Sequence, residues 1–210
     1  MGNRIKAVIF DMDGVLIEAK DWHYEALNRA LAHFGLAISR YDHLVTFDGL
    51  PTRKKLEMLT REHGLPPALH NFINELKQSY TMEIVYTRCK PRFYHEYALS
   101  RLKADGYKLA VASNSVRKSI EAMMQYSDLA KYLDVTMSNE DVAHAKPAPD
   151  IYVKSVDALG FRPGECLVVE DNEKGIQAAM GAGVPLLVVH EVTDVTYERI
   201  IKRIKEVENA

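Results

Sequence analysis

The sequence predicts an α/β fold in which a parallel sheet carries helices on both faces and a small helical domain is inserted after the first strand. Short apolar segments alternate with amphipathic helical segments along residues 93–189. This alternation predicts a parallel sheet, because parallel neighbours need crossover connections. By contrast, residues 18–87 contain no convincing strand. An inserted helical domain explains that stretch better than a long structureless loop.

The sheet core is expected to begin with residues 6–10, a β-branched and aromatic block that ends at Asp11, as a buried strand does where it enters a loop. Asp105 and Gly106 form a turn signal before the next strand. Ser115 could cap the helix after that strand, and Asp150 could cap the helix expected at residues 151–159. The remaining strands are expected at residues 108–112, near 135, 166–169 and 186–189. The helices between and after them are expected at residues 93–104, 116–124, 151–159, 174–180 and 195–208.

The inserted domain is predicted to be helical throughout. Apolar residues recur with helical spacing between Asp21, which could cap this helix, and Gly35, which could end it. Two further helices are expected at residues 52–63 and 69–86. Hinges near residues 17–20 and 86–92 then divide the chain into a core domain of residues 1–17 and 88–210 and a cap domain of residues 18–87.

Composition indicates a soluble cytoplasmic protein. Hydrophobic residues make up 47% and charged residues 27%, which is typical of globular chains. The 27 Lys and Arg nearly balance the 29 Asp and Glu, so we expect no nucleic-acid partner. Two cysteines are too few for a disulfide framework. The chain start resembles no signal peptide, and the longest apolar run, residues 184–189, is too short to cross a bilayer, so no membrane association is expected.

Polar side chains follow four of the predicted strands, at the strand ends where ligands bind in open parallel sheets. Carboxylates gathered in such a crevice repel one another, and a divalent cation would relieve that repulsion. Oxygen ligands favour Mg²⁺, which binds through one or two carboxylates and a substrate phosphate. The residues concerned are Asp11 and Asp13, then Ser113, Asn114 and Ser115, then Lys146, and finally Glu170, Asp171 and Asn172.

Four segments carry a family resemblance. They read VIFDMDGVL at residues 8–16, VASN at 111–114, KPAPDIY at 146–152 and VVED at 168–171. In this order they resemble the four motifs of the haloacid dehalogenase-like superfamily. Within it, the chain resembles the phosphatase and β-phosphoglucomutase branch, whose α-helical cap is inserted after the first strand of a Rossmann-like core. The resemblance spans essentially the whole chain.

The resemblance implies roles for the strand-end residues. Asp11 would be the nucleophile that becomes an aspartyl phosphate, and Asp13 the general acid and then the general base. Ser113 would hydrogen-bond a phosphoryl oxygen, and Lys146 would neutralise phosphoryl charge and hold Asp11 in place. Asn114 would contact the phosphate or the substrate.

The same resemblance implies a Mg²⁺ cofactor. Its ligands would be Asp171, the carboxylate of Asp11 and the backbone carbonyl of Asp13. Glu170 would contribute directly or through a water molecule.

Selectivity is expected to come from the cap. His23 matches a cap-hinge histidine of the β-phosphoglucomutase group, and Arg53, within residues 49–55, is a candidate for holding a second anionic group. Both residues also have a simpler interpretation. His23 could be an ordinary histidine on a helix surface, and Arg53 could belong to a solvated basic face. Ala19 stands where related proteins commonly carry a hydroxyl or an acidic side chain. The cap loop, residues 49–55, is one residue longer than in the mutases. These differences favour a phosphatase over a mutase.

We therefore expect a Mg²⁺-dependent phosphatase, a phosphoric monoester hydrolase, acting on a small phosphorylated metabolite, with a phosphosugar as the leading candidate. A sugar phosphomutase and a noncatalytic ligand-binding regulator on the same scaffold are the alternatives. The substrate and the oligomeric state, a monomer included, stay open. Ser115 is at least as well explained as a helix cap as by a catalytic role.

Overall fold

The computed structural model describes residues 4–209; the first three residues and the last one of the expected core lie outside this range. The described chain forms two compact units. One runs up to Glu18 and resumes at Lys90, and the other is Ala19–Cys89. Each unit has its own apolar core, so each is described separately.

The first unit is built on a parallel sheet with strand order β3-β2-β1-β4-β5. β1 lies in the middle, where Ile9 pairs with Ala110 of β2 and with Val168 of β4. Buried apolar side chains along β1 and β4 explain why these strands are central. The strands are β1 (Ala7–Phe10), β2 (Lys108–Ala112), β3 (Val135–Met137), β4 (Cys166–Glu170) and β5 (Leu186–Val188).

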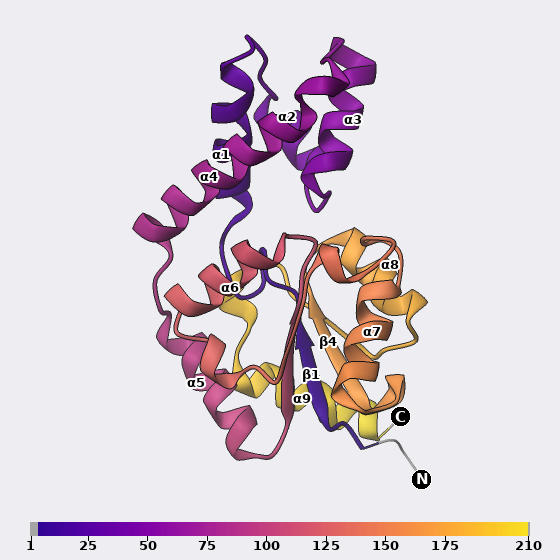
Figure 1. Ribbon diagram of the computed structural model, residues 1–210. Coiled ribbons are helices and arrows are strands. Elements are labelled where there is room, and N and C mark those ends of the chain that lie inside the picture. The colour runs from indigo at the N-terminus through magenta and orange to yellow at the C-terminus, as the bar shows by residue number, and fades with distance from the viewer. Residues whose placement is uncertain (1–3, 210) are drawn as a thin grey trace. The chain divides into compact units, whose positions relative to one another are not determined.

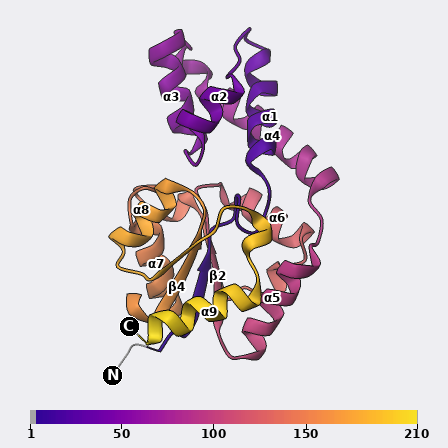
Figure 2. The same ribbon diagram turned by 180° about the vertical axis from the view of Figure 1, so that it is seen from behind.

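Helices cover both faces of this sheet (Figure 1). Ala7 and Ile9 pack with Ile151 and Ala178, which places α7 and α8 on one face. On the other face α5 contacts β2, and α9 packs against α5 (Figure 2). The helices are α5 (Phe93–Ala104), α6 (Arg117–Tyr126), α7 (Asp150–Leu159), α8 (Glu173–Gly181) and α9 (Tyr197–Glu208).

The second unit is helical, and α1 lies side by side with α4 in both views (Figures 1 and 2). Its core is a cluster of leucine, isoleucine, alanine and phenylalanine side chains that includes Leu27, Leu56 and Ile73. Gly64 ends the third helix in a left-handed conformation with φ 68°. The helices are α1 (Lys20–Ala32), α2 (Arg40–Asp42), α3 (Thr52–His63) and α4 (His70–Arg88), with a π-helical turn at His43–Phe47.

The predicted α/β fold with a parallel sheet is confirmed, but three predicted helix caps are wrong. The N-cap of α1 is Ala19, and Asp21 instead accepts a hydrogen bond from Arg40 at 2.7 Å. The N-cap of α7 is Pro149, and Asp150 accepts from His144. The third, the cap at Ser115, is described with the site below. The π-helical turn was not predicted either.

None of the helices within residues 4–209 is long and apolar enough to span a bilayer.

Candidate active site

The site begins where β1 ends. The backbone N–H of Asp11 donates to the carbonyl of Val169 on β4 at 2.9 Å, so the ladder between the two central strands fixes the position of this carboxylate. The chain then turns sharply at Gly14, whose φ of 94° is a conformation that favours glycine. Asp11 is buried, with 8% of its surface exposed, and Asp13 is half-buried. The strand end therefore presents two carboxylates, one of them well shielded from water.

The ammonium of Lys146 lies at the centre of the site. Lys146 is buried, with 4% of its surface exposed. Its Nζ contacts Asp11 Oδ1 at 2.6 Å, Glu170 Oε1 at 2.7 Å, Tyr152 OH at 2.8 Å and the carbonyl of Ala112 at 2.9 Å. A buried ammonium needs such partners, because an unpaired charge is costly to desolvate. Lys146 thus links the ends of three strands.

Glu170 closes the network from the end of β4. Its Oε1 accepts from Lys146 Nζ and, at 2.8 Å, from Tyr152 OH. Its Oε2 accepts from the backbone N–H groups of Asp171 and Asn172 at 3.0 and 3.1 Å. The carboxylate therefore holds the loop that leads into α8, in addition to the lysine.

The electrostatics of this cluster favour a bound cation. Burial raises the pKa of Asp11 well above its usual value, and the carboxylates of Glu170, Asp171 and Asp13 raise it further, while Lys146 opposes them. Burial lowers the pKa of Lys146, but Asp11 and Glu170 outweigh it, so the net pKa is raised and the lysine stays protonated. One ammonium therefore faces several carboxylates, and negative charge is in excess.

The donor set fits a hard divalent cation. Asp11, Glu170 and Asp171 each offer a carboxylate oxygen, and these three oxygens lie within 4.8 Å of one another. Both carboxylate oxygens of Asp171 are buried. Oxygen-only ligation of this kind suits Mg²⁺. The acidic cluster predicted from the strand ends is therefore present.

Two hydroxyls from the loop after β2 reach Asp13. Ser115 Oγ donates to Asp13 Oδ2 at 3.0 Å, and Ser113 Oγ lies 3.4 Å from the same oxygen. Ser113 Oγ also accepts from the backbone N–H of Ser115 at 3.1 Å. The N-cap of α6 is Val116, so Ser115 contacts the predicted acid/base residue instead of capping the helix.

Asn114 braces the lysine loop. Its Oδ1 accepts from the backbone N–H of Lys146 at 3.0 Å, and its Nδ2 donates to the carbonyl of Lys146 at 3.2 Å. This pair of hydrogen bonds positions the backbone that carries the central ammonium. The predicted contact of Asn114 with phosphate or substrate stays a prediction.

The two predicted cap residues lie in the helical unit, each with a partner there. Nδ1 of His23 lies 3.2 Å from Nζ of Lys77, a buried lysine on α4. Because an ammonium can only donate, this ring nitrogen accepts. Arg53 is largely exposed and contacts Glu57 one turn along α3 at 3.2 Å. Their predicted roles toward substrate stay predictions.

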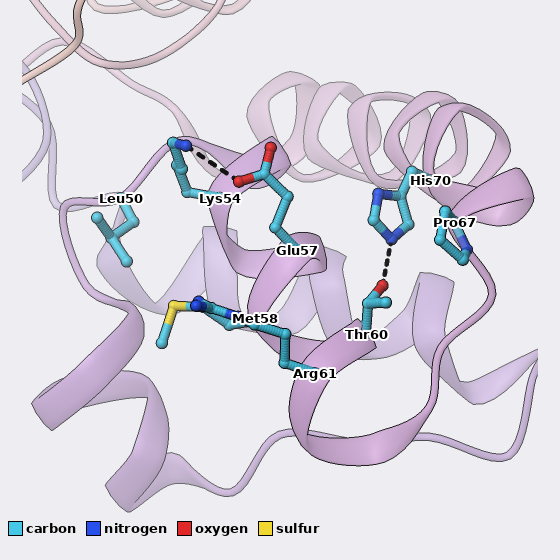
Figure 3. Close-up of a pocket in the computed structure, with 8 residues that line it drawn as sticks. All are labelled: Leu50, Lys54, Glu57, Met58, Thr60, Arg61, Pro67 and His70. Atoms are coloured by element: carbon cyan, nitrogen blue, oxygen red, sulfur yellow. Dashed lines mark hydrogen bonds and ion pairs between the residues drawn. The ribbon is translucent and has the colours of Figure 1, made fainter.

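The helical unit also carries an open pocket of about 620 Å³ (Figure 3). Thr60 Oγ1 donates to the carbonyl of Leu65 at 2.8 Å, so His70 Nε2, 2.7 Å away, is the donor to that hydroxyl. The pocket is lined by Leu50, Lys54, Glu57, Met58, Thr60, Arg61, Pro67 and His70.

Sequence reasoning missed two members of the site, Tyr152 and Gly175, and one contact, that of Ser115. Ser115 and Asp13 are 102 residues apart in the sequence, and no local sequence pattern predicts their contact. Tyr152 was visible as the last residue of the KPAPDIY segment, where a polar aromatic residue interrupts the apolar face of a helix. Gly175, whose space Glu170 occupies, was visible as a glycine within a predicted helix, which is a sign of close packing.

Comparison with known proteins shows a family match and related phosphatases. A family model described as haloacid dehalogenase-like hydrolase matches residues 8–189. The chain is 31% identical over 195 residues to a phosphorylated carbohydrates phosphatase of Thermotoga maritima, covering 90% of this chain and 88% of the relative. It is 29% identical over 188 residues to the fructose-1-phosphate phosphatase YqaB of Escherichia coli, covering 87% and 95%.

A β-phosphoglucomutase from Clostridium difficile has the same fold, with a TM-score of 0.83 at 22% identity over 96% of this chain and 98% of that chain. The phosphatase names of the sequence relatives confirm the expected enzyme class, phosphoric monoester hydrolase. Because the family model covers most of its length, the chain belongs to the haloacid dehalogenase-like hydrolases.

Proposed function

We propose that this protein is a Mg²⁺-dependent phosphatase that hydrolyses a small phosphorylated metabolite through an aspartyl-phosphate intermediate. The observation that carries the proposal is the buried contact between Lys146 Nζ and Asp11 Oδ1 at 2.6 Å, beside the carboxylates of Glu170 and Asp171. A nucleophilic carboxylate next to a protonated lysine suits attack on an anionic phosphoryl group. The proposal keeps the cytoplasmic location expected from the sequence.

In the first step, a carboxylate oxygen of Asp11 attacks phosphorus, and the bond from phosphorus to the substrate oxygen breaks. Asp13, in its acid form, gives its proton to the departing alkoxide, which leaves as an alcohol. Lys146 and the hydroxyl of Ser113 offset the charge on the phosphoryl oxygens. The products of this step are the alcohol and the aspartyl phosphate.

In the second step, Asp13 acts as the base. Its carboxylate takes a proton from a water molecule, whose oxygen attacks the phosphorus of the aspartyl phosphate. The bond between phosphorus and the Asp11 oxygen breaks, which regenerates the Asp11 carboxylate and releases inorganic phosphate. Ser115 and Ser113 lie 3.0 and 3.4 Å from Asp13 Oδ2 and keep that carboxylate in one orientation.

Mg²⁺ would be held by carboxylate oxygens of Asp11 and Asp171, with the Asp13 carbonyl and Glu170 as further contributors. When bound, it would neutralise part of the phosphoryl charge and offset the repulsion among the carboxylates. The excess of acidic groups around Asp11 supports this assignment.

We assign a phosphosugar as the substrate class. The named activities of the two sequence relatives, on phosphorylated carbohydrates and on fructose 1-phosphate, support this choice. His23 and Arg53 are the proposed substrate-binding residues of the cap. Replacing either with alanine should lower activity on the preferred phosphosugar more than on a generic aryl phosphate; equal effects on both would contradict the assignment.

The proposal is tested with purified protein, p-nitrophenyl phosphate and a panel of sugar phosphates. We expect phosphate release with Mg²⁺ and none after EDTA, with recovery when Mg²⁺ is returned. Asp11→Asn should lower kcat roughly a thousandfold or more, while Asp157→Asn, an exposed change on α7, should leave it unchanged. Substantial activity in Asp11→Asn, or turnover without metal, would contradict the proposal. Accumulation of an isomer in place of phosphate would indicate a mutase.

A further inference from the structure

Tyr152 is a buried residue of α7 whose hydroxyl lies between the two charged partners of the nucleophile. None of its surface is exposed. Its OH donates to Glu170 Oε1 at 2.8 Å and accepts from Lys146 Nζ at 2.8 Å. The ring centroid lies 4.7 Å from the same nitrogen. The side chain therefore contacts both Lys146, which pairs with Asp11, and Glu170.

The hydrogen bonds of the Lys146 ammonium show why the Tyr152 hydroxyl matters. An ammonium has three N–H donors, and four acceptors surround the Lys146 nitrogen. The direction of the ammonium thus depends on how firmly each acceptor is held. Tyr152 both accepts from Lys146 and donates to Glu170, so it holds these two groups in a fixed relation to each other.

We propose that Tyr152 is a positioning residue for phosphoryl transfer, whose hydroxyl fixes the Lys146 ammonium against Asp11 before negative charge develops on the phosphoryl oxygens. The inference rests on the proposed phosphatase function and adds a residue to its machinery. Tyr152 itself touches no reacting atom in this assignment. Its contribution should therefore appear in the transition state and not in substrate binding.

The same chemical trio occurs a second time, on the surface of the same unit, and supplies a matched control. Tyr132 OH donates to Glu96 Oε1 at 3.3 Å, and Lys131 Nζ contacts the same oxygen at 2.8 Å. Lys131 also lies 5.1 Å from the centroid of the Tyr132 ring. The side chains of Lys131 and Glu96 are 47% and 35% exposed, against 4% and 1% for Lys146 and Glu170. Solvent screening weakens the exposed trio, whereas the buried one keeps its electrostatic strength.

The test compares Tyr152→Phe with Tyr132→Phe, each of which removes one hydroxyl oxygen. With p-nitrophenyl phosphate and saturating Mg²⁺, Tyr152→Phe should lower kcat about tenfold, equivalent to about 1.4 kcal/mol, with KM within twofold of wild type. Its melting temperature should stay within about 4 °C of wild type, as expected for one lost hydrogen bond. Tyr132→Phe should leave kcat and KM unchanged.

Inhibition constants give a second measurement. Orthovanadate can adopt the trigonal-bipyramidal geometry of the transferring phosphoryl group, whereas inorganic phosphate resembles the product. In Tyr152→Phe the inhibition constant for vanadate should rise about tenfold and that for phosphate should not change. A residue that only supports the fold would not separate the two inhibitors.

The possible failures are distinct. If wild-type protein releases no phosphate with Mg²⁺, the proposed function fails and the role of Tyr152 fails with it. If wild type is active and Tyr152→Phe keeps kcat within twofold, only the positioning role is overturned. A rise in KM without a fall in kcat, or equal losses in both tyrosine variants, would also overturn it.

Discussion

The carboxylate of Glu170 occupies the space that a side chain at residue 175 would need. A Cβ added to Gly175 would lie 1.6 Å from Glu170 Oε1 and 2.0 Å from its Cδ. Gly175 is buried in the first turn of α8, so the helix approaches the end of β4 closely there. The glycine thus permits Glu170 to reach both Lys146 and the loop before α8.

We expect Gly175→Ala to inactivate the enzyme by displacing Glu170. Lys146 and the two backbone N–H groups of the loop would lose a buried anionic partner, so the free energy of unfolding should fall by about 3 kcal/mol. We expect kcat to fall by roughly a hundredfold or more, because the lysine and the proposed metal-binding loop lose their anchor together. Steady-state kinetics and thermal denaturation measure the two effects.

The control for this substitution lies in the same helix. A Cβ at Gly181 would meet Pro149 Cβ at 3.4 Å, an ordinary contact. Gly181→Ala should therefore be neutral or stabilise by up to about 1 kcal/mol, with activity unchanged. Wild-type activity and stability in Gly175→Ala would show that α8 shifts freely and that the close approach has no functional weight.

The two hydroxyls near Asp13 should be separable by phosphate inhibition. Ser115 Oγ is the closer donor, at 3.0 Å from Asp13 Oδ2, so Ser115→Ala should lower kcat about fivefold by loosening Asp13, the proposed acid/base residue. It should leave the inhibition constant for inorganic phosphate unchanged. Ser113→Ala, which removes the proposed phosphoryl contact, should raise that inhibition constant about tenfold.

Ser100→Ala, on α5, is the control and should change neither quantity. If both Ser113→Ala and Ser115→Ala weakened phosphate inhibition equally, the division of roles between the two hydroxyls would be rejected. If neither affected kcat, their contacts with Asp13 would have no catalytic consequence.

Most elements of the fold were readable from local sequence. The strands around Asp11 and Glu170 are continuous apolar blocks, and β2 has the bounds expected from the sequence. Parallel strands place their carboxyl ends at one edge of the sheet. The positions of the motifs after the strands were therefore enough to predict that Asp11, Lys146 and Glu170 lie close together.

Side-chain partners were not readable in the same way. The two hydrogen bonds of the Asn114 carboxamide to the backbone of Lys146, 32 residues away, were not expected from the sequence, and its predicted contact with the phosphate or the substrate stays a prediction. Asp21 and Asp150 were expected to cap helices, yet Asp21 accepts from Arg40, 19 residues away, and Asp150 accepts from His144, 6 residues away. A polar residue at a helix start has several possible partners, and the tertiary structure selects among them.

The π-helical turn at His43–Phe47 had no sequence signal. Its side chains follow no amphipathic pattern, because His43 and Phe47 are buried whereas Leu44 and Val45 are exposed. The wider turn follows from how the segment packs, which periodicity alone does not specify. The His43 ring lies 5.0 Å from the ring of Tyr24 on α1.

His95 should make the stability of the protein depend on pH. It is buried on α5, and its Nε2 lies 2.9 Å from the carbonyl of Val192. Burial is the main reason why its pKa is lowered to about 4. The positive charge of Arg92 lowers this pKa further, whereas hydrogen bonds to backbone carbonyls raise it. The unfolded chain binds this proton near its ordinary pKa of 6.5, so between these values protonation favours unfolding. Stability should therefore fall as pH is lowered from about 6.5 to 4 and should not depend on this group above pH 7.

Denaturant unfolding at pH 7 and pH 4 tests this dependence. His95→Gln keeps an N–H donor and cannot be protonated in this range, so wild type should lose about 3 kcal/mol more than the variant between the two pH values. His190→Gln, at an exposed position of the same unit, should follow wild type. If wild type and His95→Gln lost equal stability, the His95 imidazole would have to be protonated equally in the folded and unfolded chains, and its burial against Val192 would not control acid unfolding.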